Sequence, residues 1–107
     1  MPRSFDIEVT DENGDLVAHL AGELDLSVRA DVVTRLTGAV ADHGDPPGRL
    51  VIDLREVSFC DSSGLGALLD VRRAAGDAGV AVMLRSVPPA VDRLLELTDV
   101  DGWLTRE

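Results

Sequence analysis

The short, mostly apolar run at residues 50–54 constrains the fold of this chain more than any other segment. A run of this length and composition is typical of a strand buried on both faces, as in the centre of a sheet flanked by helices. Residues 80–84 form a second such run, and a stripe at helical spacing lies between the two, from Leu65 to Arg72. The order strand, helix, strand implies a right-handed crossover between parallel strands, so the predicted class is α/β.

The amino-terminal part of the chain predicts a hairpin. Residues 5–9 alternate apolar and polar, residues 11–15 have turn chemistry, and residues 16–20 follow as a second strand. This hairpin adds antiparallel pairing, so we expect a mixed, mostly parallel sheet of four to five strands with helices.

Two further helices are predicted from apolar spacing. The first spans roughly Ser27 to Asp42, with Ser27 as a possible N-cap, and ends before the glycines and prolines of residues 44–48. A last, short helix follows the prolines at 88–89. Residues 102–104 predict either a final edge strand or a terminal tail packed by its tryptophan.

Length and charge narrow the kind of protein. A chain of 107 residues with 45% hydrophobic content fits one domain over residues 1–107. The net charge of −10 and the absence of lysine argue against a nucleic-acid or anionic-membrane surface, since both need clustered positive charge. A basic partner is more natural, although an acidic surface that only keeps the protein in solution is the simpler interpretation.

Cys60 is the single cysteine, so an intramolecular disulfide and a cysteine-rich zinc site are both excluded. We interpret it as a small apolar filler rather than a reactive thiol. No run has the length or flanks of a signal peptide or membrane span, and we therefore expect a cytoplasmic protein with no direct membrane insertion.

Residues 61–66, which read Asp-Ser-Ser-Gly-Leu-Gly, stand where the buried strand gives way to the next helix. Glycine in a helix interior costs roughly 1 kcal/mol relative to alanine, yet Gly64 and Gly66 both fall in the first turns. One explanation is a bare surface that lets another backbone or a phosphoryl donor approach Ser62 and Ser63. The other is purely structural: Asp61 or Ser62 caps the helix and glycine permits tight packing.

This segment does not stand alone. Together with Gly-Glu-Leu-Asp at residues 22–25 and with residues 86–95, it resembles the STAS domain of bacterial anti-sigma factor antagonists over nearly the whole chain. Two departures are visible: Val87 is an extra residue before the prolines, and Cys60 stands where a larger apolar residue is usual.

The resemblance implies a phosphorylation switch. Unphosphorylated antagonist binds an anti-sigma serine kinase and frees a sigma factor, and phosphorylation of one serine ends that binding; a phosphatase resets the switch. The implied phosphoacceptor is Ser62, with Ser63 as the second candidate. The implied partner surface comprises Asp25, Asp61, Ser62, Ser63, Gly64 and Leu65. For Asp25, a role as N-cap or as a solvated loop acid stays open beside partner contact.

An enzyme would need parts that this sequence does not offer. A nucleophilic serine requires a positioned base, and the two histidines, His19 and His43, fall in a predicted strand and in the loop after the first helix. A phosphate-binding loop of the Gly-Lys type is impossible without lysine. We therefore expect no catalytic residue, cofactor or metal in this chain; ATP and magnesium belong to the kinase.

Two other functions remain as alternatives. Related STAS domains serve as accessory subunits of membrane transport complexes, where the same surface would be a permanent contact. A nucleotide-binding sensor is the weaker alternative, because no phosphate cradle is recognisable. The sequence is compatible both with a monomer and with a dimer in which Trp103 covers an edge strand.

Overall fold

The computed structural model describes residues 5–98 and 103–107, which build a five-stranded sheet in the order β1-β2-β3-β4-β5. Its strands are β1 (Asp6–Glu12), β2 (Asp15–Leu24), β3 (Arg49–Cys60), β4 (Ala81–Arg85) and β5 (Thr105–Arg106). β1 and β2 pair antiparallel, and every later pair is parallel. The predicted α/β class, with an amino-terminal hairpin on a mostly parallel sheet, is confirmed.

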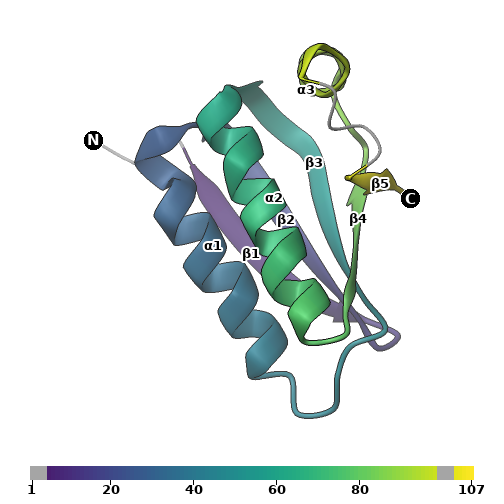
Figure 1. The fold of residues 1–107 in the computed structure, drawn as a ribbon. Helices are drawn as coiled ribbons and strands as arrows, with labels where there is room; N and C mark the ends of the chain where they lie inside the picture. The colour runs from purple at the N-terminus through teal and green to yellow at the C-terminus, as the bar shows by residue number, and fades with distance from the viewer. Residues whose placement is uncertain (1–4, 99–102) are drawn as a thin grey trace.

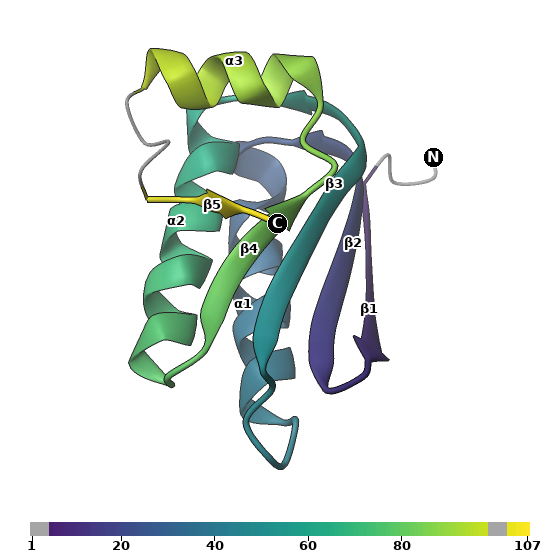
Figure 2. The same cartoon turned by 90° about the vertical axis from the view of Figure 1, so that its right-hand side faces the viewer.

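In the described residues three helices accompany the sheet: α1 (Leu26–Ala41), α2 (Ser62–Asp77) and α3 (Pro89–Leu97). α1 and α2 lie side by side on one face, and both begin at the end of the sheet that α3 crosses (Figure 1). Figure 2 shows the same end from another side, with α3 above the ends of β2 and β3. The carboxyl ends of β2 and β3 and the amino ends of two helices therefore meet in one region.

The hairpin turn has the conformation that its sequence favours. Asn13 and Gly14 both have positive φ, at 58° and 90°, which is the requirement of the two-residue turn whose twist matches that of the strands. The side chain of Asp11 accepts a hydrogen bond from the Gly14 N–H at 3.0 Å and holds the turn closed.

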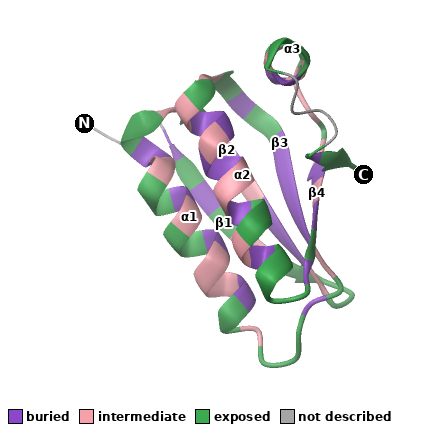
Figure 3. Cartoon of the chain, in the orientation of Figure 1, coloured by how far each residue is buried: buried purple, intermediate pink, exposed green. Residues whose placement is uncertain are grey.

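The hydrophobic core lies between the sheet and the two long helices. Alternate residues of β3 point into it, among them Leu50, Ile52 and Leu54, which are all fully buried. α1 and α2 bury one stripe each and expose the other side, as the colours of Figure 3 show. Burying one such leucine stabilises the fold by about 1.5–3 kcal/mol, so this layer fixes the helix starts against the sheet.

Several predicted boundaries need correction. β3 runs on to Cys60 instead of ending at residue 54, although Arg55 and Glu56 are exposed, because the strand stays paired with β2. α1 begins at Leu26 and is capped by Asp25, not by Ser27. The last strand is at Thr105–Arg106, after the predicted segment, of which residue 102 lies outside the described residues.

The sequence predicted a central strand flanked by helices, but α1 and α2 cover only one face of the sheet (Figure 1). Val17 and Val51 point away from α1 and α2 and are nevertheless completely buried. Arg49 and Arg85 lie on that face, and each donates a hydrogen bond to the Glu107 carboxylate. Side chains of a charged network, rather than two helices, therefore cover the second face. Among the described helices, none has the length and apolar character needed to cross a membrane.

Candidate functional site

Two acidic residues meet at the carboxyl ends of neighbouring strands. Leu24 and Cys60 are partners in the parallel register of β2 and β3, so the residues that follow them, Asp25 and Asp61, leave the sheet side by side. The Asp61 N–H donates to the Leu24 carbonyl oxygen at 3.3 Å. In open α/β sheets this edge is where ligands and partners bind.

Both aspartates cap a helix. The Asp25 carboxylate accepts from the Ser27 N–H at 3.0 Å and from the Ser27 hydroxyl at 2.6 Å. The Asp61 carboxylate accepts from the Gly64 N–H at 2.9 Å. The interpretation of these aspartates as helix caps is therefore confirmed. Each aspartate keeps a second carboxylate oxygen that the cap does not use.

Ser62 occupies the first position of α2 and is exposed, while Ser63 beside it is half-buried. In the described part of the chain neither hydroxyl forms a hydrogen bond. The positive end of the α2 dipole is at this position, which favours an added anion. Ser62 thus presents a hydroxyl oxygen to the solvent at a helix start, where the helix dipole attracts an anion and the two aspartates repel it.

The structure explains why position 64 requires glycine, which the sequence alone did not reveal. A Cβ on this residue would lie 2.1 Å from the carbonyl oxygen of Leu24, so α2 packs directly on the backbone of β2. Gly64 and Leu65 are buried within the chain. The expectation that both glycines leave a bare surface for a partner is thus corrected for Gly64, which together with Leu65 supports the serines from beneath. Gly66 is half-buried and lies against the Arg29 guanidinium.

Cys60 ends β3 immediately before this group. Burial, and to a smaller extent the negative charge of Asp61, raises the pKa of its thiol to about 11. The thiolate form is therefore scarce at neutral pH, which agrees with the interpretation of Cys60 as a small apolar filler.

The carboxyl ends of β2 and β3 and the starts of α1 and α2 form one edge of the molecule, which we call the rim. Two apolar side chains near this rim were not predicted. Leu26, the first residue of α1, is 70% exposed, and Phe59, near the end of β3, is 47% exposed. Their signal in the sequence is weak. Leu26 precedes the helical stripe that begins at Val28, and Phe59 lies beyond the apolar run at residues 50–54. Leu26 directly follows Asp25 and Phe59 precedes Asp61 by two residues, so each aspartate has an exposed apolar neighbour along the chain. Phenylalanine is among the residues enriched in protein interfaces.

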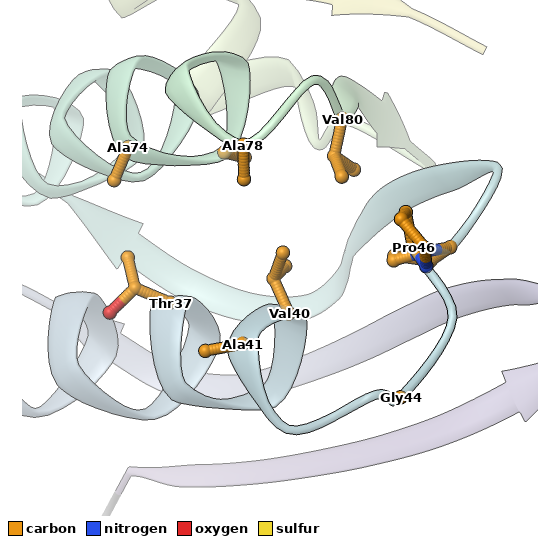
Figure 4. Close-up of a pocket in the computed structure, with 10 residues that line it drawn as sticks. Thr37, Val40, Ala41, Gly44, Pro46, Ala74, Ala78 and Val80 are labelled. Carbon is orange, nitrogen blue, oxygen red and sulfur yellow. The ribbon is translucent and has the colours of Figure 1, made fainter.

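Other candidate sites lie elsewhere. An apolar pocket of about 330 Å³ opens between the carboxyl ends of α1 and α2, lined by small residues such as Val40, Ala78 and Val80 (Figure 4). It is at the end of the molecule opposite Ser62. His43 is held by Asp11 at 2.7 Å in the loop region at that same end.

His19 is on β2, on the sheet face away from the helices, with its Nδ1 3.3 Å from the Asp53 carboxylate. In the described part of the chain neither histidine is placed to activate Ser62, so the serine has no base of the kind that nucleophilic catalysis uses.

Comparisons with known proteins agree with this architecture. The family model described as "Mlab, STAS domain" matches residues 7–106. The anti-sigma-F factor antagonist RsfB of Mycobacterium tuberculosis is 36% identical over 77 residues, which cover 72% of this chain and 61% of RsfB. The chain thus spans less than two thirds of that relative.

Solved structures give the same picture. An anti-sigma factor antagonist from Mycobacterium paratuberculosis superposes with a TM-score of 0.77 at 29% identity, over 97% of this chain and 86% of the other. The Bacillus cell fate determinant SpoIIAA in its phosphorylated form has the same fold, with a TM-score of 0.68 at 20% identity over 96% of this chain and 90% of the other. This chain belongs to the STAS domain family, and the relatives and neighbours named here are anti-sigma factor antagonists and a cell fate determinant.

Proposed function

We propose that this chain is an anti-sigma factor antagonist whose unphosphorylated form binds an anti-sigma serine kinase and so frees a sigma factor. Phosphorylation of Ser62 ends the binding, and a phosphatase restores it. The chain acts in the cytoplasm and is itself a kinase substrate, not an enzyme. The names of its relatives support the first part of this proposal.

One observation carries the assignment of Ser62. Its hydroxyl is exposed at the first position of α2 and forms no hydrogen bond in the described chain, whereas each neighbouring cap carboxylate uses one oxygen in its cap. A kinase can therefore reach this oxygen without unfolding the helix. Ser63 is the second candidate, but it is half-buried.

The transfer itself needs nothing from this chain except the serine. The Ser62 oxygen forms a bond to the γ-phosphorus of ATP on the kinase, ADP leaves, and a base of the kinase takes the hydroxyl proton. The product carries about −1.5 to −2 additional charges at the centre of the exposed rim. A partner surface fitted to a neutral hydroxyl must then desolvate that charge, which costs roughly 2–5 kcal/mol and reduces affinity by orders of magnitude.

The partner surface proposed here consists of Asp25, Asp61, Ser62 and Ser63, with Leu26 and Phe59 at its border. The acidic pair favours a basic patch on the kinase, which agrees with the net charge of −10. Gly64 and Leu65 shape this surface without being exposed on it.

The first prediction concerns Ser62 directly. Binding to an anti-sigma serine kinase of the source organism is measured by calorimetry for the wild type, Ser62→Ala and Ser62→Asp. We expect Ser62→Ala to bind within a few-fold of the wild type and Ser62→Asp to bind at least 30-fold more weakly, corresponding to about 2 kcal/mol. Incubation with the same kinase and Mg-ATP should add one phosphoryl mass to the wild type and none to Ser62→Ala.

Ser58→Asp is the matched control, because Ser58 is an exposed serine of β3 just before the rim. It should retain more affinity than Ser62→Asp. Equal affinities of wild type and Ser62→Asp would overturn the switch, and a phosphoryl group retained in Ser62→Ala but lost in Ser63→Ala would move it to Ser63. A tight complex with a transporter ATPase that ignores all these substitutions would favour the accessory-subunit alternative.

A further inference from the structure

Ser62, Gly66 and Asp70 follow one another at intervals of four residues along α2. Residues with this spacing lie above one another on one face of a helix, with about 5–6 Å between successive Cβ positions. The ridge therefore has a serine hydroxyl at its start, no side chain at its middle and a carboxylate at its end.

Arg29 of α1 reaches across to this ridge. Its Nη2 donates to the Asp70 carboxylate at 3.0 Å. A Cβ on Gly66 would lie only 2.6 Å from Nη1 and 2.8 Å from Cζ of Arg29, so the guanidinium rests directly on the glycine. Gly66 is about 6 Å along the helix from Ser62, so the guanidinium rests on the next position of this ridge after the serine that the proposed function phosphorylates.

The present pairing of Arg29 is replaceable. Asp70 is also bound by Arg73, whose Nη2 donates to the other carboxylate oxygen at 3.2 Å. Asp70 would therefore keep a cationic partner if Arg29 turned away. The Arg29 side chain is 38% exposed, which leaves it free to change rotamer on the surface.

A phosphate on Ser62 needs such a cation. Asp25 and Asp61 stand beside it, and their negative charges repel a dianion. A guanidinium binds a phosphate more strongly than a single carboxylate, because it can offer two parallel N–H donors to a group with greater charge.

From this arrangement we propose that Arg29 is the intramolecular phosphate receptor of the switch, exchanging its Asp70 partner for phosphorylated Ser62. This inference rests on the proposed function. In the unphosphorylated chain, Arg29 ties α1 to α2 through Asp70. After phosphorylation it ties the same helices through the phosphate one turn nearer the rim, so that the modified serine is held against α1 and the aspartates no longer face an unpaired dianion.

The test uses the full chain with phosphoserine installed at position 62 during translation, so it needs neither the kinase nor the partner. The second ionisation of the phosphate, ordinarily near pKa 6, is followed by phosphorus NMR against pH. We expect the pKa in Arg29→Gln to be about 0.5 unit higher than in the wild type, since an opposite charge nearby favours the dianion and solvent weakens the effect.

Arg73→Gln is the matched control. Arg73 also bonds to Asp70, but it lies eleven residues beyond Ser62, about 16 Å along the helix. It should leave the phosphate pKa unchanged. In the wild type, the Arg29 Nε–H resonance should also move on phosphorylation. The Arg73 Nε–H resonance should move less, because Arg73 keeps its bond to Asp70.

Equal phosphate pKa values in the wild type and Arg29→Gln, or an equal change in Arg73→Gln, would overturn the receptor role. Melting of both unphosphorylated variants near the wild-type temperature shows that the comparison is between folded proteins. The two proposals can fail separately. If no kinase modifies Ser62, the proposed switch is wrong, but the titration still tests whether Arg29 binds a phosphate at this position. If the phosphate pKa does not respond to Arg29→Gln, Arg29 is not the receptor and the proposed switch is unaffected.

Discussion

At the scale of single residues, two glycines of α2 have opposite surroundings and give a sharp test of the site's architecture. Gly64 packs on the Leu24 carbonyl, whereas a Cβ on Gly76 would meet no described atom within 4 Å apart from its chain neighbours and the backbone of its own helix. We expect Gly64→Ala to lower the free energy of unfolding by about 2–3 kcal/mol, since the backbone must move apart. Gly76→Ala should raise it by up to about 1 kcal/mol through helix propensity.

Urea unfolding of the two variants measures both values in the same helix. A Gly64→Ala variant as stable as the wild type would contradict the close packing of α2 on β2. This contact also shows why sequence reasoning placed Gly64 at the site but misread its surroundings. The segment identifies a glycine that cannot be replaced, yet the atom that excludes a side chain belongs to Leu24, forty residues earlier, and only the fold brings the two together.

At the scale of elements, apolar periodicity predicted the right helices and strands but not their ends. The core stripes of α1 and α2 were readable because each buried position repeats at helical spacing. β3 extends six residues past its apolar run because pairing with β2, and not burial, keeps it extended as far as Cys60. The predicted start of α1 was wrong because Asp25 and Ser27 are both good cap residues, and only the geometry of the chain decides between them.

Asp25 caps α1 and is also assigned to the partner surface, and two substitutions separate these roles. Asparagine keeps an oxygen that can accept from the Ser27 N–H but removes the charge, whereas alanine removes both. Asp25→Ala should lower the free energy of unfolding by about 1 kcal/mol, and Asp25→Asn by a few tenths.

Partner affinity should fall in both Asp25 variants, if the charge meets a basic patch on the kinase. Thermal unfolding and calorimetric binding of the two proteins provide the comparison. Wild-type affinity in Asp25→Asn would remove Asp25 from the partner surface and leave it as a helix cap.

At the scale of the whole molecule, the surface around Ser62 and the loops at the other end of the sheet are separate. The hairpin turn and the loop after α1 are joined far from Ser62, where the Gly48 N–H donates to the Gly14 carbonyl oxygen at 3.0 Å. At the same end, His43 in the loop after α1 bonds to Asp11 near the end of β1. A change confined to these loops should therefore alter stability without altering the surface at the rim.

The His43 contact predicts how stability depends on pH. The Asp45 carbonyl and then the Asp11 carboxylate raise the pKa of His43 above its ordinary 6.5, because both ring nitrogens act as donors only in the imidazolium. His43, followed by the Gly14 N–H, lowers the pKa of Asp11 below 3.8. The stabilisation from His43 is thus complete below about pH 6.5 and is lost as the pH rises through the higher folded pKa.

The stabilisation from Asp11 has the opposite sign: it is present above about pH 3.8 and is lost as the pH falls through the lower folded value. Urea unfolding at pH 6 and pH 8 should show a decrease in the wild type that is smaller in His43→Gln and in Asp11→Asn. Combining both substitutions should reduce it little further, because the two residues share one contact. An equal decrease in all four proteins would show that this contact does not couple folding to protonation, while unchanged partner binding in His43→Gln would confirm that the two ends of the molecule act independently.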